Sequence, residues 1–266
     1  MKILVCLKQI IDPEIPGRDF KIDSQGKAAD SEGANLVTNI FCENALETAL
    51  QLQDVNEGTE ITVLCFGPAS ADDRLRKALA MKANHAVRID EAQPSGPDSE
   101  YVSLVLAKAI QQLGGFDLVM LGREAGDWGM GQTGAYLAER LGLPLVSLVD
   151  EISLEGNAAL MRRQSDDGWE RYRVPLPAVA TITNSDDNLP RIPKTRDIMK
   201  SSRQSIRQIS LQELGLSNDH LEAVGLRVDS LSLPTEKLNC EFVEGETLEA
   251  RIEDLAEKIT TIVKQV

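Results

Sequence analysis

Apolar residues in this chain follow two alternating patterns. Short continuous runs predict buried β-strands at 2–7, 60–66, 85–89, 117–121 and 145–149. Helical spacing predicts a helix carrying Ala45, Leu46, Ala49, Leu50 and Leu52, one from Ser70 or Asp72 to Met81, and others over 99–113 and 131–142. Strand and helix alternate four times, which predicts βαβ units with right-handed crossovers. The expected fold is α/β, with an open, mostly parallel, doubly wound sheet and helices on both faces.

After residue 150 the pattern changes to polar and apolar alternation. Two such stretches flank the sequence SDDG at 165–168, and a Gly-containing turn between alternating runs predicts an antiparallel hairpin over 158–174. A last apolar run, Ala178 to Thr183, is expected to complete the sheet.

The C-terminal part of the chain is expected to hold one regular element. Residues 184–205 contain Pro190 and Pro193 and show no sustained period, which favours an irregular connection. Residues 247–266 predict an amphipathic helix, whose apolar positions are Leu248, Ile252, Leu255, Ile259, Ile262 and Val266. Such a helix docks either on its own domain or on a partner subunit, and the sequence favours neither.

Composition and charge narrow the class of protein. The chain has 266 residues, of which 42% are hydrophobic and 26% charged, enough for one α/β core with an appendage. The net charge of -14 repels nucleic acid and anionic membrane surfaces. A bound nucleotide is therefore expected to rely on backbone groups and helix dipoles. The apolar N-terminal run is too short for a signal sequence or a membrane span, so we expect a cytoplasmic protein without membrane insertion.

Residue types that carry metal or nucleophilic chemistry are sparse. The four cysteines show no C-x-x-C spacing, and His85 and His220, the two histidines, do not supply a plausible zinc set. No serine lies in a G-x-S-x-G motif. We expect reduced, mostly buried thiols and no catalytic residues.

The most informative stretch is LGREAGDWGMGQTGAYLAERLGLP at 121–144. A strand ending at Gly122 leads through a glycine-rich turn into a helix that Gly142 and Pro144 terminate. Free N–H groups and the positive end of the helix dipole favour a phosphate at such a helix start, and Thr133 adds a hydroxyl. The stretch is neither G-x-G-x-x-G nor a Walker A motif, so an ordinary βα turn explains it about as well.

Ligands of open α/β sheets bind outside the carboxyl ends of the strands, where the strand order reverses. The segments at those ends are 6–8, 66–68 and 122–133. We expect them to converge on one cleft.

Six stretches resemble, in order and spacing, the β subunit of electron-transfer flavoproteins. They are MKILVCLKQIID at the N-terminus, TNIFCENALETAL (38–50), FGPAS (66–70) followed by LAMKANHAV (79–87), LGREAGDWGMGQTG (121–134) and PRIPKTRDIMK (190–200). The resemblance covers residues 1 to about 203.

The resemblance implies an α/β subunit of the adenine-nucleotide-binding type that forms a heterodimer with an α subunit carrying the redox FAD. In many members that the chain resembles, the β subunit holds an AMP with a structural role, and the resemblance implies the same here. The α-subunit flavin accepts electrons from acyl-CoA or other flavin dehydrogenases and passes them to a quinone reductase or another acceptor, so the chain is expected to be an electron carrier subunit and not an enzyme. The implied division is a nucleotide-binding domain (1–189), a partner-recognition loop (190–203) and a C-terminal arm (204–266).

The family's nucleotide contacts carry over onto four stretches of this sequence. The phosphate is expected at the helix start, while Cys6, Phe41 and Phe66 border the adenosine. Plain core packing is the alternative for Cys6 and Phe66. The complete set is Cys6, Asn39, Ile40, Phe41, Cys42, Phe66, Asp127, Trp128, Gly129, Met130, Gly131, Gln132, Thr133 and Gly134.

Departures from the family pattern concern the nucleotide. AMP-type members usually carry an acidic run before Q-T-G, whereas here Trp128 and Gly129 follow Asp127. Trp128 is able to stack on a base or flavin ring, or to cover the cleft. The sequence PRIP at 190–193 is closer to the electron-bifurcating branch, which places a second FAD at this site, but Thr133 is closer to the AMP branch. AMP is favoured and FAD is the alternative.

The recognition loop departs as well. The family's apolar anchor, a leucine, corresponds to Thr195, and a small polar residue does not fill an apolar pocket. We therefore expect more electrostatic partner contacts, since Lys194, Arg196, Lys200 and Arg203 are basic in an acidic chain. The expected partner-binding set is Arg191, Lys194, Thr195, Arg196, Ile198, Met199 and Lys200.

A competing hypothesis is an ATP-binding regulatory module resembling universal stress proteins, which predicts a homodimer without a flavoprotein partner. It gives no purpose to the hairpin, the recognition loop or the C-terminal helix. An adenylating enzyme needs a catalytic set that the sequence does not contain.

Overall fold

The computed structural model of the protein describes residues 1–90, 98–217, 226–234 and 240–264. His220 and Val266 lie outside the described residues. The chain divides into two compact units, Met1–Leu231 and Ser232–Val266.

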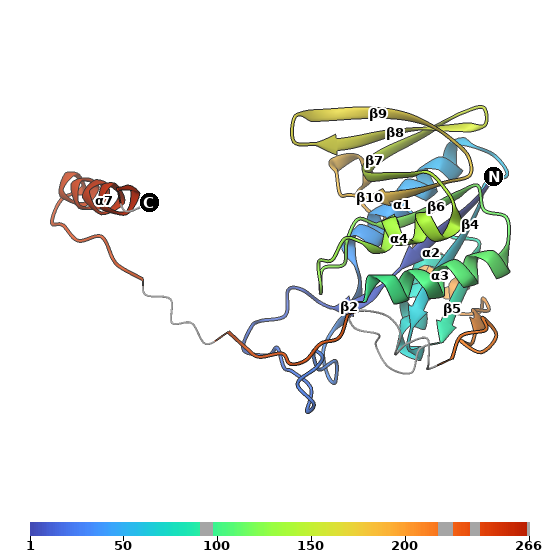
Figure 1. Ribbon diagram of the computed structural model, residues 1–266, viewed down its shortest axis with the longest axis horizontal. Coiled ribbons are helices and arrows are strands. Elements are labelled where there is room, and N and C mark those ends of the chain that lie inside the picture. The colour runs from blue at the N-terminus through green and yellow to red at the C-terminus, as the bar shows by residue number, and fades with distance from the viewer. Residues whose placement is uncertain (91–97, 218–225, 235–239, 265–266) are drawn as a thin grey trace. The chain divides into compact units, whose positions relative to one another are not determined.

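The first unit is built on a nine-stranded sheet with the order β11-β5-β4-β1-β6-β10-β7-β8-β9 (Figure 1). Neighbouring strands from β11 to β7 run parallel, and β7, β8 and β9 form an antiparallel extension. The predicted α/β class and the predicted hairpin are confirmed. The strands are β1 (Lys2–Leu7), β4 (Glu60–Gly67), β5 (His85–Asp90), β6 (Leu118–Gly122), β7 (Leu145–Glu155), β8 (Ala158–Ser165), β9 (Gly168–Pro175), β10 (Ala178–Ile182) and β11 (Arg207–Ile209).

Helices cover both faces of the parallel part because its strands are apolar on both sides. In β1, Ile3 and Val5 pack with α1 and α2, while Leu4 packs with α3 and α4. Figure 1 shows α3 and α4 in front of the sheet. The helices are α1 (Ile40–Val55), α2 (Asp72–Ala80), α3 (Ser99–Leu113), α4 (Thr133–Leu141) and α5 (Thr195–Ser201), with 3-10 turns η1 (Ala69–Ala71) and η2 (Asp186–Asn188).

The apolar run at 178–183 is confirmed as a strand of the sheet, in which β10 lies between β6 and β7. Two other predicted elements need correction. Strand β7 continues from the predicted 145–149 to Glu155, since it pairs with β8 beyond the parallel sheet. Helix α4 begins at Thr133 and not at residue 131, because the left-handed φ of +64° at Gly131 is incompatible with a helix.

The hydrophobic pattern did not predict several short elements. Strands β2 (Gln9–Ile11) and β3 (Leu36–Thr38) form an antiparallel pair that closes the long connection after β1. The predicted irregular stretch 184–205 contains η2 and α5, and β11 adds a further edge strand. Each of these elements is three or seven residues long, too short for periodicity to reveal.

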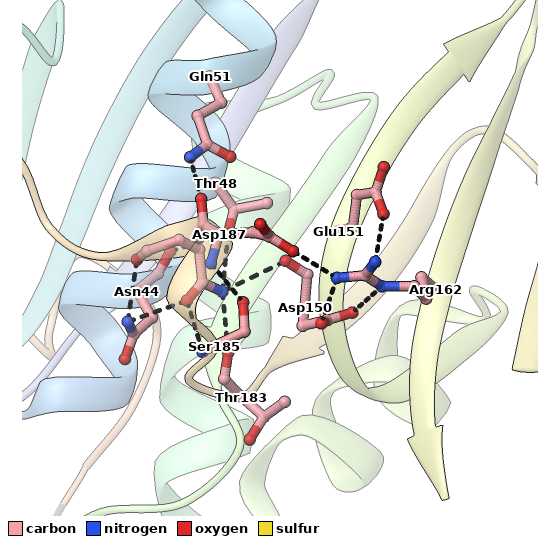
Figure 2. Close-up of polar contacts among 10 residues, drawn as sticks. Asn44, Thr48, Gln51, Asp150, Glu151, Arg162, Thr183, Ser185 and Asp187 are labelled. Carbon is pink, nitrogen blue, oxygen red and sulfur yellow. Dashed lines mark hydrogen bonds and ion pairs between the residues drawn. The ribbon is translucent and has the colours of Figure 1, made fainter. Parts of the chain in front are cut away.

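A buried asparagine joins three parts of the first unit. Asn188 is fully buried and is the centre of what we call the polar hub: Asn44, Thr48, Asp150, Thr183, Ser185 and Asn188. Figure 2 labels the other five members. Its Nδ2 donates to the backbone oxygens of Thr183 (2.9 Å) and Asp150 (3.3 Å). Its Oδ1 accepts from the Ser185 backbone (2.9 Å) and from Asn44 Nδ2 on α1 (3.1 Å). The hub therefore ties α1 and β7 to the segment after β10.

An ion pair extends this network to the hairpin. Arg162 of β8 donates from Nε and Nη2 to the two carboxylate oxygens of Asp150, at 2.9 and 2.7 Å, and Asp150 is buried. Nη2 also reaches Asp187 at 2.8 Å, and the guanidinium lies 4.6 Å from the centre of the Trp169 ring. The hydrogen bonds that Arg162 donates to Asp150 and Asp187 raise the pKa of Arg162, which stays charged.

The second unit contains helix α7 (Leu248–Val263), which confirms the predicted C-terminal helix. Thr247 caps it by accepting a hydrogen bond from Ala250 N at 3.2 Å. The apolar stripe is exposed, including Leu248 and Ile252, so the residues of this unit that the structure describes leave it uncovered.

The polar hub generates a prediction about stability. Asn188→Ala leaves several buried donors and acceptors without partners, so the free energy of unfolding is expected to fall by about 2–4 kcal/mol. Urea denaturation followed by circular dichroism measures it. The control Asn184→Ala changes an exposed asparagine four positions earlier and is expected to stay within about 0.5 kcal/mol of the wild type. Equal stability of both variants would contradict a supporting role for the hub.

Candidate functional site

The strand order reverses between β1 and β6. The chain moves from β1 to β4 and β5 on one side, and then crosses to β6 on the other. Reversal points of this kind leave a crevice at the carboxyl ends of the two strands. The segments after β1, β4 and β6, which the sequence marked as candidates, all begin at that end of the sheet.

The loop after β6 starts with an unusually close backbone contact. A Cβ on Gly122 would lie 2.8 Å from the backbone carbon and the Cβ of Phe41, and 2.9 Å from Cys42 N. Only glycine permits this approach. The end of β6 is therefore pressed against the first turn of α1, which places residues 122–132, here called the glycine-rich loop, beside residues 39–42.

Two side chains from other parts of the sequence, those of Asn39 and Lys8, hold the glycine-rich loop. Asn39 Nδ2 donates to Glu124 O at 2.7 Å, and Asn39 Oδ1 accepts from Gly126 N at 3.0 Å. Lys8, just after β1, donates to Asp127 Oδ1 at 2.8 Å, and Asp127 also accepts from Trp128 N at 2.9 Å. The negative charge of the Asp127 carboxylate is thus paired with the Lys8 ammonium group of the same chain.

The glycine-rich loop ends at a helix start that suits an anion. The side chain of Gln132, the N-cap of α4, makes no capping hydrogen bond, and the first turn carries no acidic residue. Gly129 and Gly131 have φ of +63° and +64°, which L side chains rarely adopt. Backbone N–H groups at such a helix start attract phosphate, so the residues present fit a phosphate-bearing ligand.

Gly134 fixes where that helix start lies. A Cβ on Gly134 would fall 2.2 Å from Cγ2 of Thr181, a buried residue of β10. Thr181 Oγ1 accepts a hydrogen bond from Leu148 N at 3.3 Å, so its rotamer is held. The absent side chain lets the first turn of α4 lie directly on the sheet.

The two cysteines of the predicted set are core residues. Cys6 packs in the core cluster with α3 and α4, and Cys42 in the cluster with α1 and α2. Burial raises the pKa of both thiols, and for Cys42 the hydrogen bond from Asn39 offsets part of the rise. Both thiols are protonated at neutral pH. They therefore act as packing groups of the core and not as nucleophiles.

The predicted aromatic residues are partly buried. The Phe66 ring meets Tyr101 of α3 edge-on, with ring centres 6.1 Å apart. The Phe41 ring lies 4.4 Å below the guanidinium of Arg123. Of the other predicted contacts, Ile40 is half exposed and Met130 is 37% exposed.

The predicted partner-binding residues divide into two kinds. Arg191 is tied to α1: Nη2 lies 2.8 Å from Glu47 Oε1 and 2.8 Å from Asp54 Oδ2, and these hydrogen bonds raise the pKa of Arg191. The remaining residues begin α5 and are exposed: Lys194, Thr195, Arg196, Ile198, Met199 and Lys200. The Arg76 guanidinium of α2 reaches Ser201 O at 3.2 Å and holds the far end of α5.

Sequence reasoning missed several contacts and residues of these regions. Lys8 and Gly126 lie inside the predicted segments 6–8 and 122–133, but nothing in the sequence pairs them with Asp127 and Asn39. Gln9 donates to Ser70 Oγ at 2.9 Å between the ends of β1 and β4, and its buried Oε1 has no partner among the described residues. A buried acceptor of this kind fits a ligand hydroxyl or amino donor. Ile192, between two prolines, is 92% exposed.

Other features of the described part of the chain lie elsewhere or are absent. A hollow of about 530 Å³ opens at the amino ends of the strands, lined by Lys2, His85 and Arg207 among others. It is at the opposite end of the sheet from the glycine-rich loop. No three His, Cys, Asp or Glu residues within the described ranges form a group that could hold a metal ion. None of the helices described has the length and apolar character needed to cross a membrane.

Comparisons with known proteins agree with this architecture. Residues 29–214 match the family model of the electron transfer flavoprotein domain. The chain is 34% identical over 264 residues to the caffeyl-CoA reductase-Etf complex subunit CarD of Acetobacterium woodii, covering 97% of this chain and 98% of that protein. It is 33% identical over 212 residues to the electron transfer flavoprotein subunit beta of Megasphaera elsdenii, covering 77% of each. For the same subunit of Thermoanaerobacterium thermosaccharolyticum the identity is 30% over 264 residues, 98% of each.

The family model covers well over half of the chain, and two of the relatives align over nearly its whole length. This similarity favours the flavoprotein interpretation over a module like the universal stress proteins. The chain belongs to the electron transfer flavoprotein family and is similar to its β subunits.

Proposed function

We propose that this chain is a cytoplasmic β-type subunit that holds an adenine nucleotide, AMP in the first place, and pairs with an α-type subunit carrying the redox FAD. Membership of a β-subunit family implies the α-type partner. The observation that carries the nucleotide proposal is the start of α4, which lies on the sheet at Gly134 without a side-chain cap from Gln132. It lies at the reversal point of the sheet, where such ligands bind.

Each end of the nucleotide has candidate contacts. The backbone of Gly131, Gln132, Thr133 and Gly134 would hold the phosphate, with the Thr133 hydroxyl as an additional donor. The adenosine would lie along the other predicted residues, between Phe66 and the start of α1. The protein has a net charge of -14, so local N–H groups must provide the attraction. The pairing of Asp127 with Lys8 removes one repulsive charge from the loop.

The proposed role of the chain in electron transfer is structural. FAD in the α-type subunit would supply the redox chemistry when bound. This chain would support that subunit, hold the nucleotide for rigidity, and present residues 190–203, here called the recognition segment, to partner proteins. Donors would be acyl-CoA or other flavin dehydrogenases, and the acceptor a quinone reductase or another carrier. The chain itself would be a carrier subunit and not an enzyme.

A second candidate is a bifurcating-type subunit with a second FAD in place of AMP. The similarity to CarD supports it, because that name joins an Etf to a reductase of a CoA thioester, and the match spans 97% of this chain. The short sequence PRIP at 190–193 points the same way.

Nucleotide content decides between the two candidates. We expect the complex of this chain with an α-type subunit of the family to release one FAD and one AMP per heterodimer on denaturation. Chromatography of the released nucleotides measures both. Two FAD and no AMP would establish the second candidate. A chain that forms no complex and releases ATP would contradict both.

The contact at Gly134 predicts a rescue by a second substitution. Gly134→Ala forces the start of α4 off the sheet, and an overpacking penalty of about 1–3 kcal/mol corresponds to nucleotide binding weaker by about five- to a hundredfold. Thr181→Ser removes the clashing Cγ2 but keeps the hydroxyl, so the double variant is expected to regain most of the affinity. Titration of the nucleotide-depleted heterodimer with AMP measures it. The single variant Thr181→Ser is the control, and tight binding by Gly134→Ala alone would argue against a phosphate at this position.

The cationic recognition segment predicts salt-dependent electron transfer. With an acyl-CoA dehydrogenase as donor, Lys194→Ala with Arg196→Ala is expected to raise KM for the heterodimer by about three- to tenfold at low salt and much less at high salt. The matched control, Arg171→Ala with Arg173→Ala, removes two charges from exposed positions of β9. Rates that respond to neither salt nor the first pair would contradict electrostatic docking.

A further inference from the structure

Asn39 is the N-cap residue of α1, yet its side chain makes no capping hydrogen bond. Asparagine is among the preferred N-cap residues because its side-chain oxygen ordinarily accepts from the second or third N–H of the helix. Here the oxygen accepts from Gly126 N at 3.0 Å instead, 87 positions further along the chain. The Asn39 side chain thus departs from the usual capping preference and binds a distant loop instead of its own helix. Departures of this kind from local sequence preferences concentrate at functional sites.

The amide group of Asn39 is used on both sides. Nδ2 donates to Glu124 O at 2.7 Å and lies 3.3 Å from Cys42 Sγ, while Oδ1 holds Gly126 N. The side chain therefore binds an acceptor and a donor of the loop backbone two residues apart. Asn39 is 1% exposed and its two bonds to the loop backbone are partly buried, which limits competition from water.

The residue that carries this amide is itself fixed. Asn39 N donates to Lys8 O at 2.9 Å, which attaches the start of α1 to the chain just after β1. The Lys8 side chain then reaches Asp127, one residue beyond Gly126. A Cβ on Gly126 would lie 3.4 Å from Ile10 Cδ1 and 3.7 Å from Asn39 Oδ1, so the loop packs closely on these groups. Residues 8–10, residue 39 and the glycine-rich loop form one connected unit.

The loop leads from this attachment to the helix start at which phosphate binding is proposed. Gly122 is fixed against α1 at one end, and Gly134 is fixed against Thr181 at the other. The left-handed glycines 129 and 131 lie between the Asn39 contacts and Thr133. The Asn39 bonds therefore restrict the part of the loop that would otherwise be free to move the glycines away from the helix start.

We propose that Asn39 is a positioning residue, whose carboxamide holds the glycine-rich loop in the conformation that binds the nucleotide. This inference rests on the proposed nucleotide site. It deepens that proposal by giving the Asn39 side chain a task that is not direct ligand contact, since its oxygen and nitrogen are already engaged by the protein. Neighbouring residues of α1 remain the candidates for touching the ligand.

Two substitutions separate positioning from simple structural support. Asn39→Ser supplies a preferred N-cap for α1 but is too short to hold both Glu124 O and Gly126 N. Asn39→Asp keeps an acceptor for Gly126 N but turns an oxygen toward Glu124 O. Both variants are expected to weaken nucleotide binding by at least about tenfold, because preorganisation of the loop is lost. The serine variant is expected to keep the unfolding midpoint of the wild type, since the helix gains a cap.

The experiment uses the complete heterodimer, depleted of nucleotide and titrated with AMP or FAD, whichever the wild type releases. Hydrogen exchange of residues 122–132 is measured in the depleted form, where faster exchange is expected in both variants. Asn56→Ser is the matched control, because this asparagine ends the same helix, donates to Leu52 O at 2.8 Å and lies at the opposite end from the loop. Its affinity is expected to equal that of the wild type.

The outcomes are distinct. A wild-type heterodimer that binds the nucleotide while Asn39→Ser binds it equally well would overturn the positioning role and leave the proposed function intact. Weaker binding that appears only together with a lowered unfolding midpoint, or equally in Asn56→Ser, would reduce Asn39 to structural support. A wild-type heterodimer without any adenine nucleotide would reject the proposed site and this inference with it.

Discussion

The candidate site depends on one steric constraint, the contact between the end of β6 and the first turn of α1. A side chain at Gly122 would overlap the backbone of Phe41 and Cys42. The two segments lie 80 residues apart in sequence and meet because β1 and β6 are neighbours in the sheet. Without this contact Asn39 would not reach the loop, since the hydrogen bonds of its side-chain amide to the loop are 2.7 and 3.0 Å long. A missing Cβ thus makes the polar attachment possible.

Helix α1 contacts both regions for which a function is proposed, the glycine-rich loop and the recognition segment. Its N-cap holds the glycine-rich loop, and residues in its middle hold the recognition segment and the hub before it. Asn44 donates to Asn188, and Glu47 pairs with Arg191 immediately before the exposed Ile192. One helix, packed along the sheet, therefore supports both the proposed nucleotide site and the recognition segment. A rigid support of this kind suits a subunit whose proposed task is to hold other groups in place.

Buried polar groups decide how the hairpin joins the parallel sheet. The buried carboxylate of Asp150 is neutralised by a bidentate ion pair with Arg162. The backbone oxygen of Asp150 accepts a hydrogen bond from Asn188 Nδ2. Breaking one partner of such a pair leaves an uncompensated charge in the core, which is costly. This makes the arrangement of β7, β8 and η2 specific, and it fixes the direction in which the chain enters the recognition segment.

The amino-acid sequence alone determined the repeating strand and helix order, the hairpin and the C-terminal helix, because each follows from a local period. The rule that ligands of open α/β sheets bind at the carboxyl ends of the strands pointed to the candidate segments, and family resemblance selected the residues within them. What the sequence did not determine are the contacts between distant segments: the place of β10 inside the sheet, the pairing of Lys8 with Asp127, and the diversion of Asn39 from its own helix to the loop. These depend on which strands become neighbours, and strand order arises from packing of the whole sheet. Short elements such as α5 needed the same context, since seven residues form a stable helix only when neighbours such as Arg76 hold its end.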